Sequence, residues 1–250
     1  MTRQRLKDLA SLSRGKGRRA HGQFLVEGLR SVEAALEAGA PLVEVVLEAG
    51  AHPALTSRAL EAGVEVAEVS ARDLERVAST RSSQGVVAVS CSIVSDEPVG
   101  LEGSVLILDG VQDPGNVGAL VRTAAWFGVT TVVADEKTAD FESPKAVRAS
   151  MGGLWDVRLV RVPGLEVVLD ALQTRGGALW GADLEGVPLN EWTPSSTDAL
   201  VVGSEAHGLS ANVRSRLEGA VQISGAPSRC GVESLNVAVA SGILVARWLA

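Results

Sequence analysis

The sequence is poor in aromatic residues, and this scarcity limits how the protein could recognise a nucleic acid. Its 250 residues include five Trp and three Phe but no Tyr, so only 3% are aromatic. Proteins that hold single strands by stacking place aromatic rings under successive bases. We therefore do not expect base stacking on an aromatic platform to be the main mode of recognition.

Cysteine, histidine and long apolar runs are also scarce. The two cysteines, Cys91 and Cys230, have no metal-ligand spacing, and the three histidines are scattered, so we expect free thiols and no bound metal. No apolar run approaches the roughly 20 residues that cross a membrane. The charged N-terminus has no apolar segment behind it, unlike a secretory signal. These features predict a cytoplasmic protein that does not enter a membrane.

Positive charge is in the minority overall but is concentrated at the N-terminus. The formal net charge is −7, yet residues 1–30 carry eight Lys and Arg against only Asp8 and Glu27. A solvated, frayed terminus would have the same composition. A basic leader on an acidic body is also typical of an electrostatic contact with nucleic acid.

Two stretches of alternating strand-like and helix-like segments predict two α/β regions. In residues 1–95, short apolar runs alternate with segments of helical spacing. Strands are expected at 23–27, 42–47, 64–69 and 85–91, and helices at 29–38, 53–62 and 71–79. Residues 96–103 are polar and contain Pro and Gly, so they predict a linker.

The second region, residues 104–250, has apolar and β-branched runs that are typical of parallel strands buried on both faces. Strands are expected at 104–109, 130–134, 157–162, 178–182, 199–203 and 220–223, and helices at 117–127, 144–152, 165–175 and 233–249. This alternation predicts an open parallel sheet wrapped by helices. Ligands of such sheets bind beyond the carboxyl ends of the strands.

Three polar segments follow predicted strands, and the first begins after Asp109. Residues 113–115 form a turn, and Asn116 is expected to cap the next helix. Gly118 would let this helix pack closely, and Arg122 is expected near the face of Asn116 and Gly118. Asn and Arg are common at such positions, so this segment alone leaves a structural and a functional role open. It is not a dinucleotide fingerprint, because no G-x-G-x-x-G follows the strand.

The second segment brackets a carboxylate with two glycines, from Gly203 through Glu205 to Gly208. Glycine permits a close approach between backbone and ligand, although both could be ordinary turn residues. The segment lacks the G-K-[ST] end of a phosphate-binding loop and the G-x-S-x-G pattern of a serine hydrolase. It therefore predicts backbone contacts to a ligand of another kind.

The third segment opens the C-terminal helix. An irregular loop follows the strand at 220–223, and Glu233, Ser234 and Asn236 then lead into a strongly apolar run. Polar side chains that enter a buried helix need hydrogen-bond partners. Either a ligand or the local backbone supplies them.

Together these segments resemble motifs of the SpoU (TrmH-like) branch of the SPOUT methyltransferases. Residues 116–122 and 203–208 are similar to the first two motifs, and residues 234–237 to the third. Residues 143–152 and the strand at 24–28 extend the resemblance over nearly the whole chain. It implies a C-terminal α/β domain with a parallel sheet and a deep trefoil knot, a rare exception to the absence of knots, preceded by a small α/β substrate-binding domain.

The resemblance also implies an activity and partners. The family transfers a methyl group from S-adenosylmethionine to a ribose 2′-oxygen in RNA and works as a homodimer through the C-terminal domain. No metal is required, because methyl transfer from a sulfonium releases a neutral leaving group. The N-terminal half resembles the substrate-binding domain of rRNA-modifying members, which favours large-subunit rRNA over tRNA, and leaves the nucleotide and any role in drug resistance open.

Three sets of site residues follow from the resemblance, position by position. The catalytic set is Asn116, Arg122, Glu205, Ser234 and Asn236. The cofactor-binding set is Val202, Gly203, Ser204, Gly208, Ile223 and Leu235. The RNA-binding set is Arg14, Lys16, Arg18, Arg19 and Arg148. One departure affects the cofactor contacts in 224–231, because Ser224 stands where the family usually has proline, and Pro227 comes later.

Arg122 has two possible roles in such a site. The family assigns proton removal to this position, but a neutral guanidinium near pH 7 would cost roughly 7 kcal/mol. We therefore expect Arg122 to stabilise the developing alkoxide and to grip a phosphate bidentately.

Two other functions compete with this prediction. In one, the C-terminal domain only dimerises and the protein binds RNA without catalysis, which a test of cofactor binding would decide. In the other, the protein is a Rossmann-type dehydrogenase, which the missing glycine fingerprint disfavours. A tRNA methyltransferase is the alternative within the favoured class.

Overall fold

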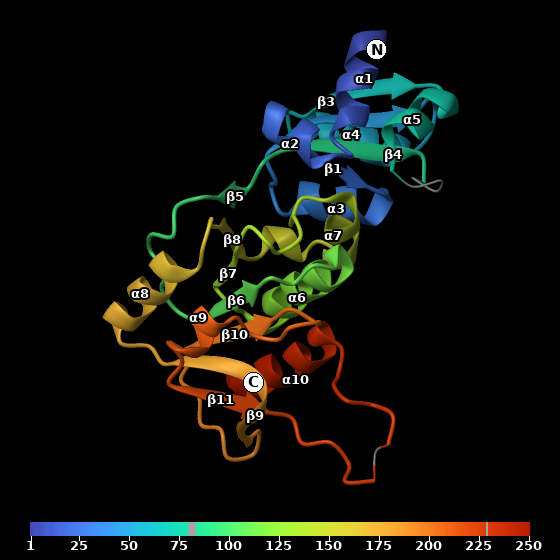
Figure 1. Ribbon diagram of the computed structural model, residues 1–250. Helices are drawn as coiled ribbons and strands as arrows, with labels where there is room; N and C mark the ends of the chain where they lie inside the picture. The colour runs from blue at the N-terminus through green and yellow to red at the C-terminus, as the bar shows by residue number, and fades with distance from the viewer. Residues whose placement is uncertain (80–83, 229) are drawn as a thin grey trace. The chain divides into compact units, whose positions relative to one another are not determined.

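The computed structural model describes residues 1–79, 84–228 and 230–250 (Figure 1). Its contacts divide the chain into two units. The first holds Met1–Ile93 together with Asp140–Asp156, and the second holds Val94–Ala139 together with Val157–Ala250. The chain therefore leaves the first unit, returns to it for one short segment, and leaves it again. Among the described residues no helix has the length and apolarity to cross a membrane.

The first unit is built on a mixed four-stranded sheet. Its strands are β1 (Gln23–Glu27), β2 (Leu42–Glu48), β3 (Glu65–Val69) and β4 (Val86–Cys91), in the order β1-β4-β2-β3. Its helices are α1 (Arg3–Ser11), α2 (Gly15–His21), α3 (Leu29–Glu37), α4 (Pro53–Glu61), α5 (Ala71–Val77) and α7 (Pro144–Ser150), followed by a 3-10 turn at Gly153–Trp155. Strands β2 and β3 are parallel, and the other pairs are antiparallel.

The basic leader is folded rather than frayed. Leu9 and Leu12 belong to the apolar core of this unit, so α1 is attached to the sheet through its buried face. In α2 the Arg18 side chain is only 7% exposed, and it donates to the carbonyl oxygen of Leu12 and to Oδ2 of Asp140. The leader that the sequence predicted as an RNA contact is thus also a structural element of the first unit.

A buried carboxyl group holds the end of β4. Glu142 Oε1 accepts hydrogen bonds from Ser92 Oγ at 2.7 Å and from the Ile93 amide at 2.9 Å. Burial raises the pKa of Glu142 above its ordinary value of 4.5, and these two hydrogen bonds oppose that shift. Residues of the returning segment therefore fix the point where the chain leaves the first unit.

The second unit is a seven-stranded, wholly parallel sheet covered by helices on both faces. Its strands are β5 (Val94–Ser95), β6 (Val105–Asp109), β7 (Thr131–Ala134), β8 (Arg158–Arg161), β9 (Leu179–Pro188), β10 (Ala199–Gly203) and β11 (Gly219–Gln222). Its helices are α6 (Pro114–Phe127), α8 (Glu166–Arg175), α9 (Ala211–Arg214) and α10 (Val237–Leu249). The strand order is β11-β9-β10-β6-β7-β8-β5.

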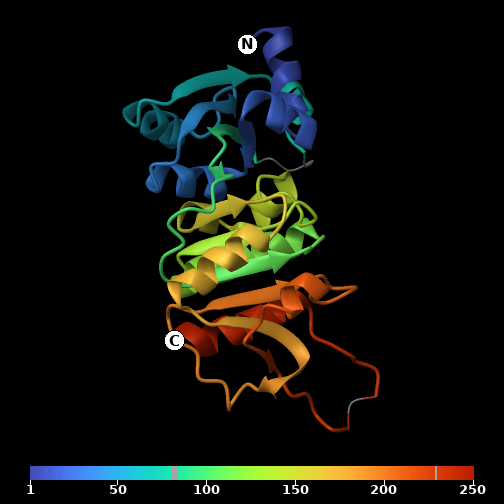
Figure 2. The same cartoon turned by 60° about the vertical axis from the view of Figure 1, so that its left-hand side comes forward.

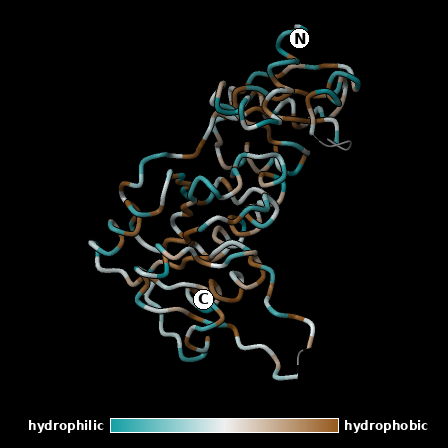
Figure 3. Tube along the Cα trace, viewed as in Figure 1, coloured by the Kyte–Doolittle hydropathy of each residue, from teal (hydrophilic) through white to brown (hydrophobic). Residues whose placement is uncertain are grey.

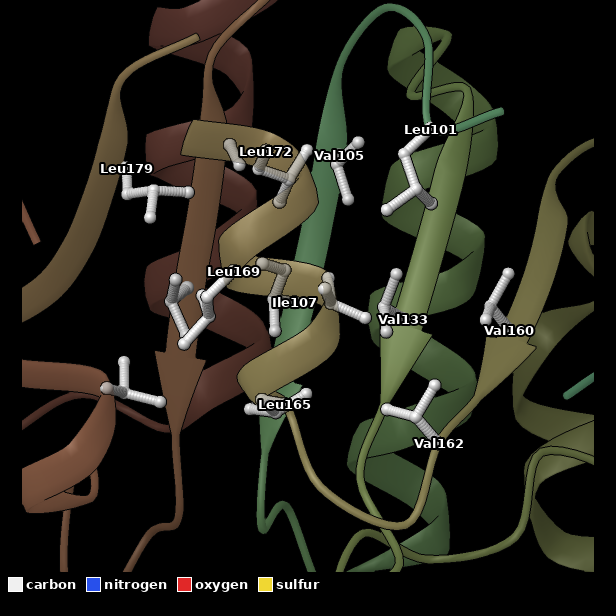
Figure 4. Packing of buried hydrophobic residues seen from close by; sticks show 14 of the residues in the cluster. Leu101, Val105, Ile107, Val133, Val160, Val162, Leu165, Leu169, Leu172 and Leu179 are labelled. Carbon is white, nitrogen blue, oxygen red and sulfur yellow. The ribbon is translucent and has the colours of Figure 1, made fainter. Parts of the chain in front are cut away.

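The apolar runs of the sequence are the centre of this sheet. Every residue of β6 and β7 is buried, as are Ala199–Val202 of β10. Helix α8 contributes Val168, Leu169 and Leu172 to the core on one face, and Figure 2 shows it lying across the strands. Figure 4 shows α6 and α10 behind the same strands, on the opposite face. Burial on both faces explains why these strands are continuous apolar runs.

Several predicted boundaries were wrong. A short strand, β5, directly precedes the predicted linker and pairs with β8, and it was not predicted. The C-terminal helix begins at Val237, not at Glu233, because residues 230–235 are exposed and belong to a loop that extends away from the sheet in Figure 1. Figure 3 shows hydrophobic, hydrophilic and pale segments along this loop rather than a continuous apolar run. Helices α1, α2 and α9 were not predicted. The knot stays a prediction.

Candidate active site

The site lies where the strand order reverses. From β6 the chain moves to β7 and β8 on one side, whereas β10 pairs with β6 on the other side. The last residues of β6 and β10, Asp109 and Gly203, face each other in the register. Ligands of open parallel sheets bind in the crevice at such a switch point. The segments that follow these two strands are the first two predicted motifs.

A tight turn shapes the segment after β10. Ser204 and Gly208 exchange two backbone hydrogen bonds, of 3.1 and 2.8 Å. Gly208 has φ of +64°, and a Cβ added at Gly203 would lie 2.3 Å from the carbonyl carbon of Gly208. Both glycines are therefore required by the backbone itself. The turn leaves Glu205 exposed at its tip, while Asp109 anchors the next residues by accepting from the Ser210 amide at 2.6 Å.

Hydrogen bonds join side chains from all three motifs. Asn116 Nδ2 donates to Glu205 Oε1 at 2.6 Å, and Asn236 Nδ2 donates to Asn116 Oδ1 at 3.1 Å. Asn236 also caps α10, because its Oδ1 accepts from the amides of Ala238 and Val239. We call the series Asn236–Asn116–Glu205 the amide chain. It connects residues that are 89 and 120 positions apart in the sequence.

The prediction that Asn116 caps its helix was wrong. Helix α6 begins at Pro114, and Asp113 is its N-cap, with its carboxylate accepting from the Gly115 and Asn116 amides. Proline is suited to the first helical position because its missing N–H leaves no donor unsatisfied. This cap frees the Asn116 side chain to bond Glu205.

A cavity of about 740 Å³ opens beside the amide chain. Its walls come from β9, the segment after β10, β11, the loop before α10 and α10 itself. All six residues predicted to contact the cofactor line it, namely Val202, Gly203, Ser204, Gly208, Ile223 and Leu235. Glu205, Ser234 and Asn236 line it as well. Its volume is in the range of small-molecule sites.

The walls of this cavity suit S-adenosylmethionine. Val202, Val221 and Leu244 offer apolar surface of the kind that an adenine ring needs. Among the described residues, the charged members of the lining are three carboxylates, of Asp183, Glu185 and Glu205, and one guanidinium, of Arg214. S-adenosylmethionine combines a sulfonium, an ammonium and a carboxylate and so has a net charge of +1. A net negative lining attracts such a cation.

Arg122 does not join the other members of the predicted catalytic set. It is exposed, it is not among the residues that line the cavity, and it makes no hydrogen bond or ion pair with the residues that the structure describes. Six residues of α-helix separate it from Asn116, which turns its side chain by about 120° around α6. Gly118, in contrast, is four residues before Arg122 in α6, so the predicted proximity holds for Gly118 but not for Asn116.

The predicted RNA-binding residues fall into two groups. Arg14, Lys16 and Arg19 are exposed on or beside α2, where their charges are available to phosphates. Arg18 is buried, and Arg148 donates to Glu27 Oε2 at 3.3 Å and to Ser79 Oγ at 2.9 Å. The first group is exposed, and the second has hydrogen-bond partners within the first unit.

Three charged residues that line the cavity, Asp183, Glu185 and Arg214, were missed by sequence reasoning. Asp183 lies within β9 and Arg214 ends α9, and an ion pair joins them in the cavity wall. Asp183 follows the apolar residues Leu179–Ala182, so a polar residue after an apolar strand run could have indicated it. Nothing around Arg214 in the sequence distinguishes it from a surface residue.

The chain is similar over nearly its whole length to RNA methyltransferases. The model of the SpoU rRNA Methylase family matches residues 103–246, and that of the MRM3-like substrate binding domain matches residues 3–88. The chain is 32% identical to the 23S rRNA (guanosine(2553)-2′-O)-methyltransferase RlmP of Bacillus subtilis, over 97% of this chain and 94% of RlmP. It is 35% identical to the 23S rRNA (guanosine-2′-O-)-methyltransferase RlmB of Xanthomonas axonopodis pv. citri, over 88% of this chain and 93% of that one.

A solved structure agrees with these sequence similarities. The AdoMet-bound rRNA methyltransferase from Sinorhizobium meliloti superposes with a TM-score of 0.85 at 26% identity, over 99% of this chain and 94% of that one.

Proposed function

We propose a substrate and a mechanism from the premise that this chain belongs to the SpoU rRNA Methylase family, whose model covers more than half of its residues. Its activity is the S-adenosylmethionine-dependent methylation of a ribose 2′-oxygen in RNA. The proposed substrate is a guanosine of 23S rRNA, the RNA named for both relatives. We place the reaction in the cytoplasm, with residues 1–95 binding RNA and residues 104–250 carrying the chemistry.

The amide chain is the observation that carries this proposal. It brings the polar residues of three separate motifs to the rim of a cavity whose size and charge suit the cofactor. A domain used only for dimerisation would not need to bring these polar groups together at the rim of a cavity. A non-catalytic RNA-binding dimer therefore does not explain why the amide chain lies beside the cavity.

The chemistry requires a ribose hydroxyl to lose its proton while its oxygen is held in line for transfer. Bound S-adenosylmethionine supplies the electrophilic methyl group. Glu205 fixes the orientation of the Asn116 amide by accepting its Nδ2, and Asn236 fixes the opposite end. We assign Asn116, Asn236 and the Ser234 hydroxyl to holding the ribose, with Glu205 holding Asn116.

Arg122 does not reach the amide chain of its own protomer, and a homodimer would bring Arg122 of the second protomer to the site. Trp126 on α6 is 82% exposed, and Val239 and Ile243, one turn apart on α10, are 53% and 39% exposed. Helices α6 and α10 pack against each other, and each bears exposed apolar side chains that a second copy would cover. Arg122 lies one turn before Trp126 on α6. We assign it to the site of the partner protomer, where it stabilises the developing alkoxide and grips a phosphate.

The reaction and its substrate are tested with purified protein, radiolabelled S-adenosylmethionine and RNA from a strain that lacks the gene. The labelled RNA is separated by size and digested to nucleosides. We expect label in 2′-O-methylguanosine from large rRNA. Label in tRNA would overturn the substrate, and absence of cofactor binding would overturn the activity.

The shared site is tested with mixed dimers. Arg122→Ala and Asn116→Ala homodimers should each be inactive. In a mixed dimer with one subunit of each variant, one of the two sites has both native residues. Mixed dimers should therefore regain up to about half of the native activity per dimer. No recovery in mixed dimers would place Arg122 in the site of its own protomer.

A further inference from the structure

One ion pair in the cavity wall lies outside the three motifs. Asp183 of β9 and Arg214 of α9 are 31 residues apart, and their carboxylate and guanidinium meet at the edge of the cavity. Asp183 has a side chain that is 11% exposed, and Arg214 is 47% exposed. Both side chains line the cavity, the carboxylate largely buried and the guanidinium about half exposed, so a ligand in the cavity meets both charges.

The backbone around the pair fixes both side chains. Arg214 Nε donates to the Leu209 carbonyl oxygen at 3.1 Å. Its Nη2 lies 3.3 Å from the position that a Cβ on Gly208 would take, so the guanidinium rests close to the turn after β10. On the other side, Asp183 Oδ1 accepts from the Glu185 amide at 3.1 Å. A guanidinium held in this way is oriented before any ligand binds, which lowers the entropy cost of binding.

The chemistry of the cavity makes Arg214 unusual. It is the one cationic side chain among the described residues that line the cavity, in which Asp183, Glu185 and Glu205 are anionic. A cofactor that ends in an amino acid brings an α-carboxylate, and an α-carboxylate buried without a cation or donors is costly. Arginine is the side chain whose donors match a carboxylate bidentately.

We propose that Asp183 and Arg214 bind the amino-acid end of S-adenosylmethionine, with Arg214 on the α-carboxylate and Asp183 on the α-ammonium. This assignment rests on the proposed function, since it concerns the same cavity. It also specifies the orientation of the cofactor: the amino-acid end lies at Asp183 and Arg214, and the adenosine part occupies the remainder of the cavity. The α-carboxylate of the ligand then pairs with Arg214 and its α-ammonium pairs with Asp183, so both protein charges keep an opposite charge as a partner.

The test compares two ligands that differ in the amino-acid end alone. S-adenosylhomocysteine has this end, and 5′-methylthioadenosine keeps the adenosine and the thioether but lacks it. Titration calorimetry on the full-length protein gives the dissociation constant of each. We expect Arg214→Ala to weaken S-adenosylhomocysteine by about 10-fold or more, the effect of losing a charge-assisted contact, and to change 5′-methylthioadenosine by less than about 2-fold.

A neighbouring pair provides the matched control. Arg216, two residues further along, pairs with Asp170 and is not among the cavity lining. Arg216→Ala removes the same kind of charge from the same region and should leave both ligands unchanged. Arg214→Lys keeps the charge without the fork and should recover part of the affinity for S-adenosylhomocysteine alone.

The outcomes separate this inference from the proposed function. Equal weakening of both ligands by Arg214→Ala would mean that Arg214 only supports the turn at Gly208, and no weakening of either would remove it from the site. Each result overturns the inference while leaving the cofactor in place. A native protein that binds neither ligand would overturn the proposed function itself.

Decarboxylated S-adenosylmethionine tests the two assignments separately. It lacks the α-carboxylate but keeps the ammonium. Its affinity should be insensitive to Arg214→Ala and should fall with Asp183→Asn. A loss of affinity with Arg214→Ala, or no loss with Asp183→Asn, would contradict the assignment.

Discussion

The substitution Asn116→Asp should convert the central hydrogen bond of the amide chain into a repulsion, because an anionic oxygen would replace the Nδ2 atom that lies 2.6 Å from Glu205 Oε1. Two unit charges at this distance repel by about 1.6 kcal/mol at the dielectric of water and by about 6 kcal/mol at an effective dielectric of 20. Glu205 is exposed, so we take a value near the first limit. The lost hydrogen bond adds about 1 kcal/mol.

A smaller term opposes this cost. Asn116 lies in the first turn of α6, where a carboxylate gains about 0.5 kcal/mol from the helix dipole. The net penalty is then about 2 kcal/mol, which corresponds to a loss of about 30-fold in rate if it falls on the active arrangement. The assay is the initial rate of methyl transfer to large-subunit rRNA at pH 8, with thermal unfolding in parallel.

The chain contains a matched control for this substitution. Asn212, in the first turn of α9, donates from Nδ2 to Glu166 Oε1 at 2.8 Å, and both residues are exposed. Asn212→Asp therefore introduces the same repulsion outside the lining of the cavity and should lower stability without lowering the rate. A native rate for Asn116→Asp at pH 8, or an equal loss for Asn212→Asp, would refute the role of the amide chain.

Three other substitutions test separate parts of the structure. Gly203→Ala places a methyl group 2.3 Å from the carbonyl carbon of Gly208. We therefore expect the free energy of unfolding to fall by about 1–3 kcal/mol and calorimetry to detect no binding of S-adenosylhomocysteine. Normal binding would contradict the tight turn. Glu142→Gln should gain stability relative to the native protein as the pH rises from about 4 to 7 in urea titrations, and a constant difference would count against a raised pKa of Glu142. Arg19→Ala should reduce the slope of log RNA affinity against log salt concentration by about 1. Arg18→Ala should lower the melting temperature and leave this slope unchanged. The same slope for Arg19→Ala as for the native protein would mean that Arg19 does not contact the RNA.

The sign of the Glu142 prediction follows from the direction of its shift. Burial raises the pKa of Glu142 in the folded protein above the value of 4.5 expected for the unfolded chain. Its contribution to stability is therefore complete below the unfolded value and is lost as the pH rises through the folded value. Glutamine cannot ionise and keeps an oxygen for Ser92 and Ile93, so the variant avoids this loss.

Local sequence patterns predicted the strands of the second unit and the turns that follow them. The apolar runs at 105–109 and 199–203 are buried on both faces, and burial of this kind permits hardly any polar residue. The glycines at 203 and 208 were correctly placed at the end of a strand, because a turn this tight excludes a side chain. Boundaries failed where the pattern was weak, as at Glu233, since the loop and α10 are both largely uncharged.

The sequence by itself determined the class of sheet, the three motifs and, through their resemblance, the kind of reaction. The tertiary structure alone decided which side chains meet: that Asp113 rather than Asn116 caps α6, that Arg122 lies away from Asn116, that Arg18 is bound by Asp140, and that Asp183 pairs with Arg214. The physical reason is distance along the chain. Strand and turn patterns are set by neighbours a few residues apart, whereas the amide chain joins residues 89 and 120 positions apart, which become neighbours only when β6, β10 and α10 have packed into one unit.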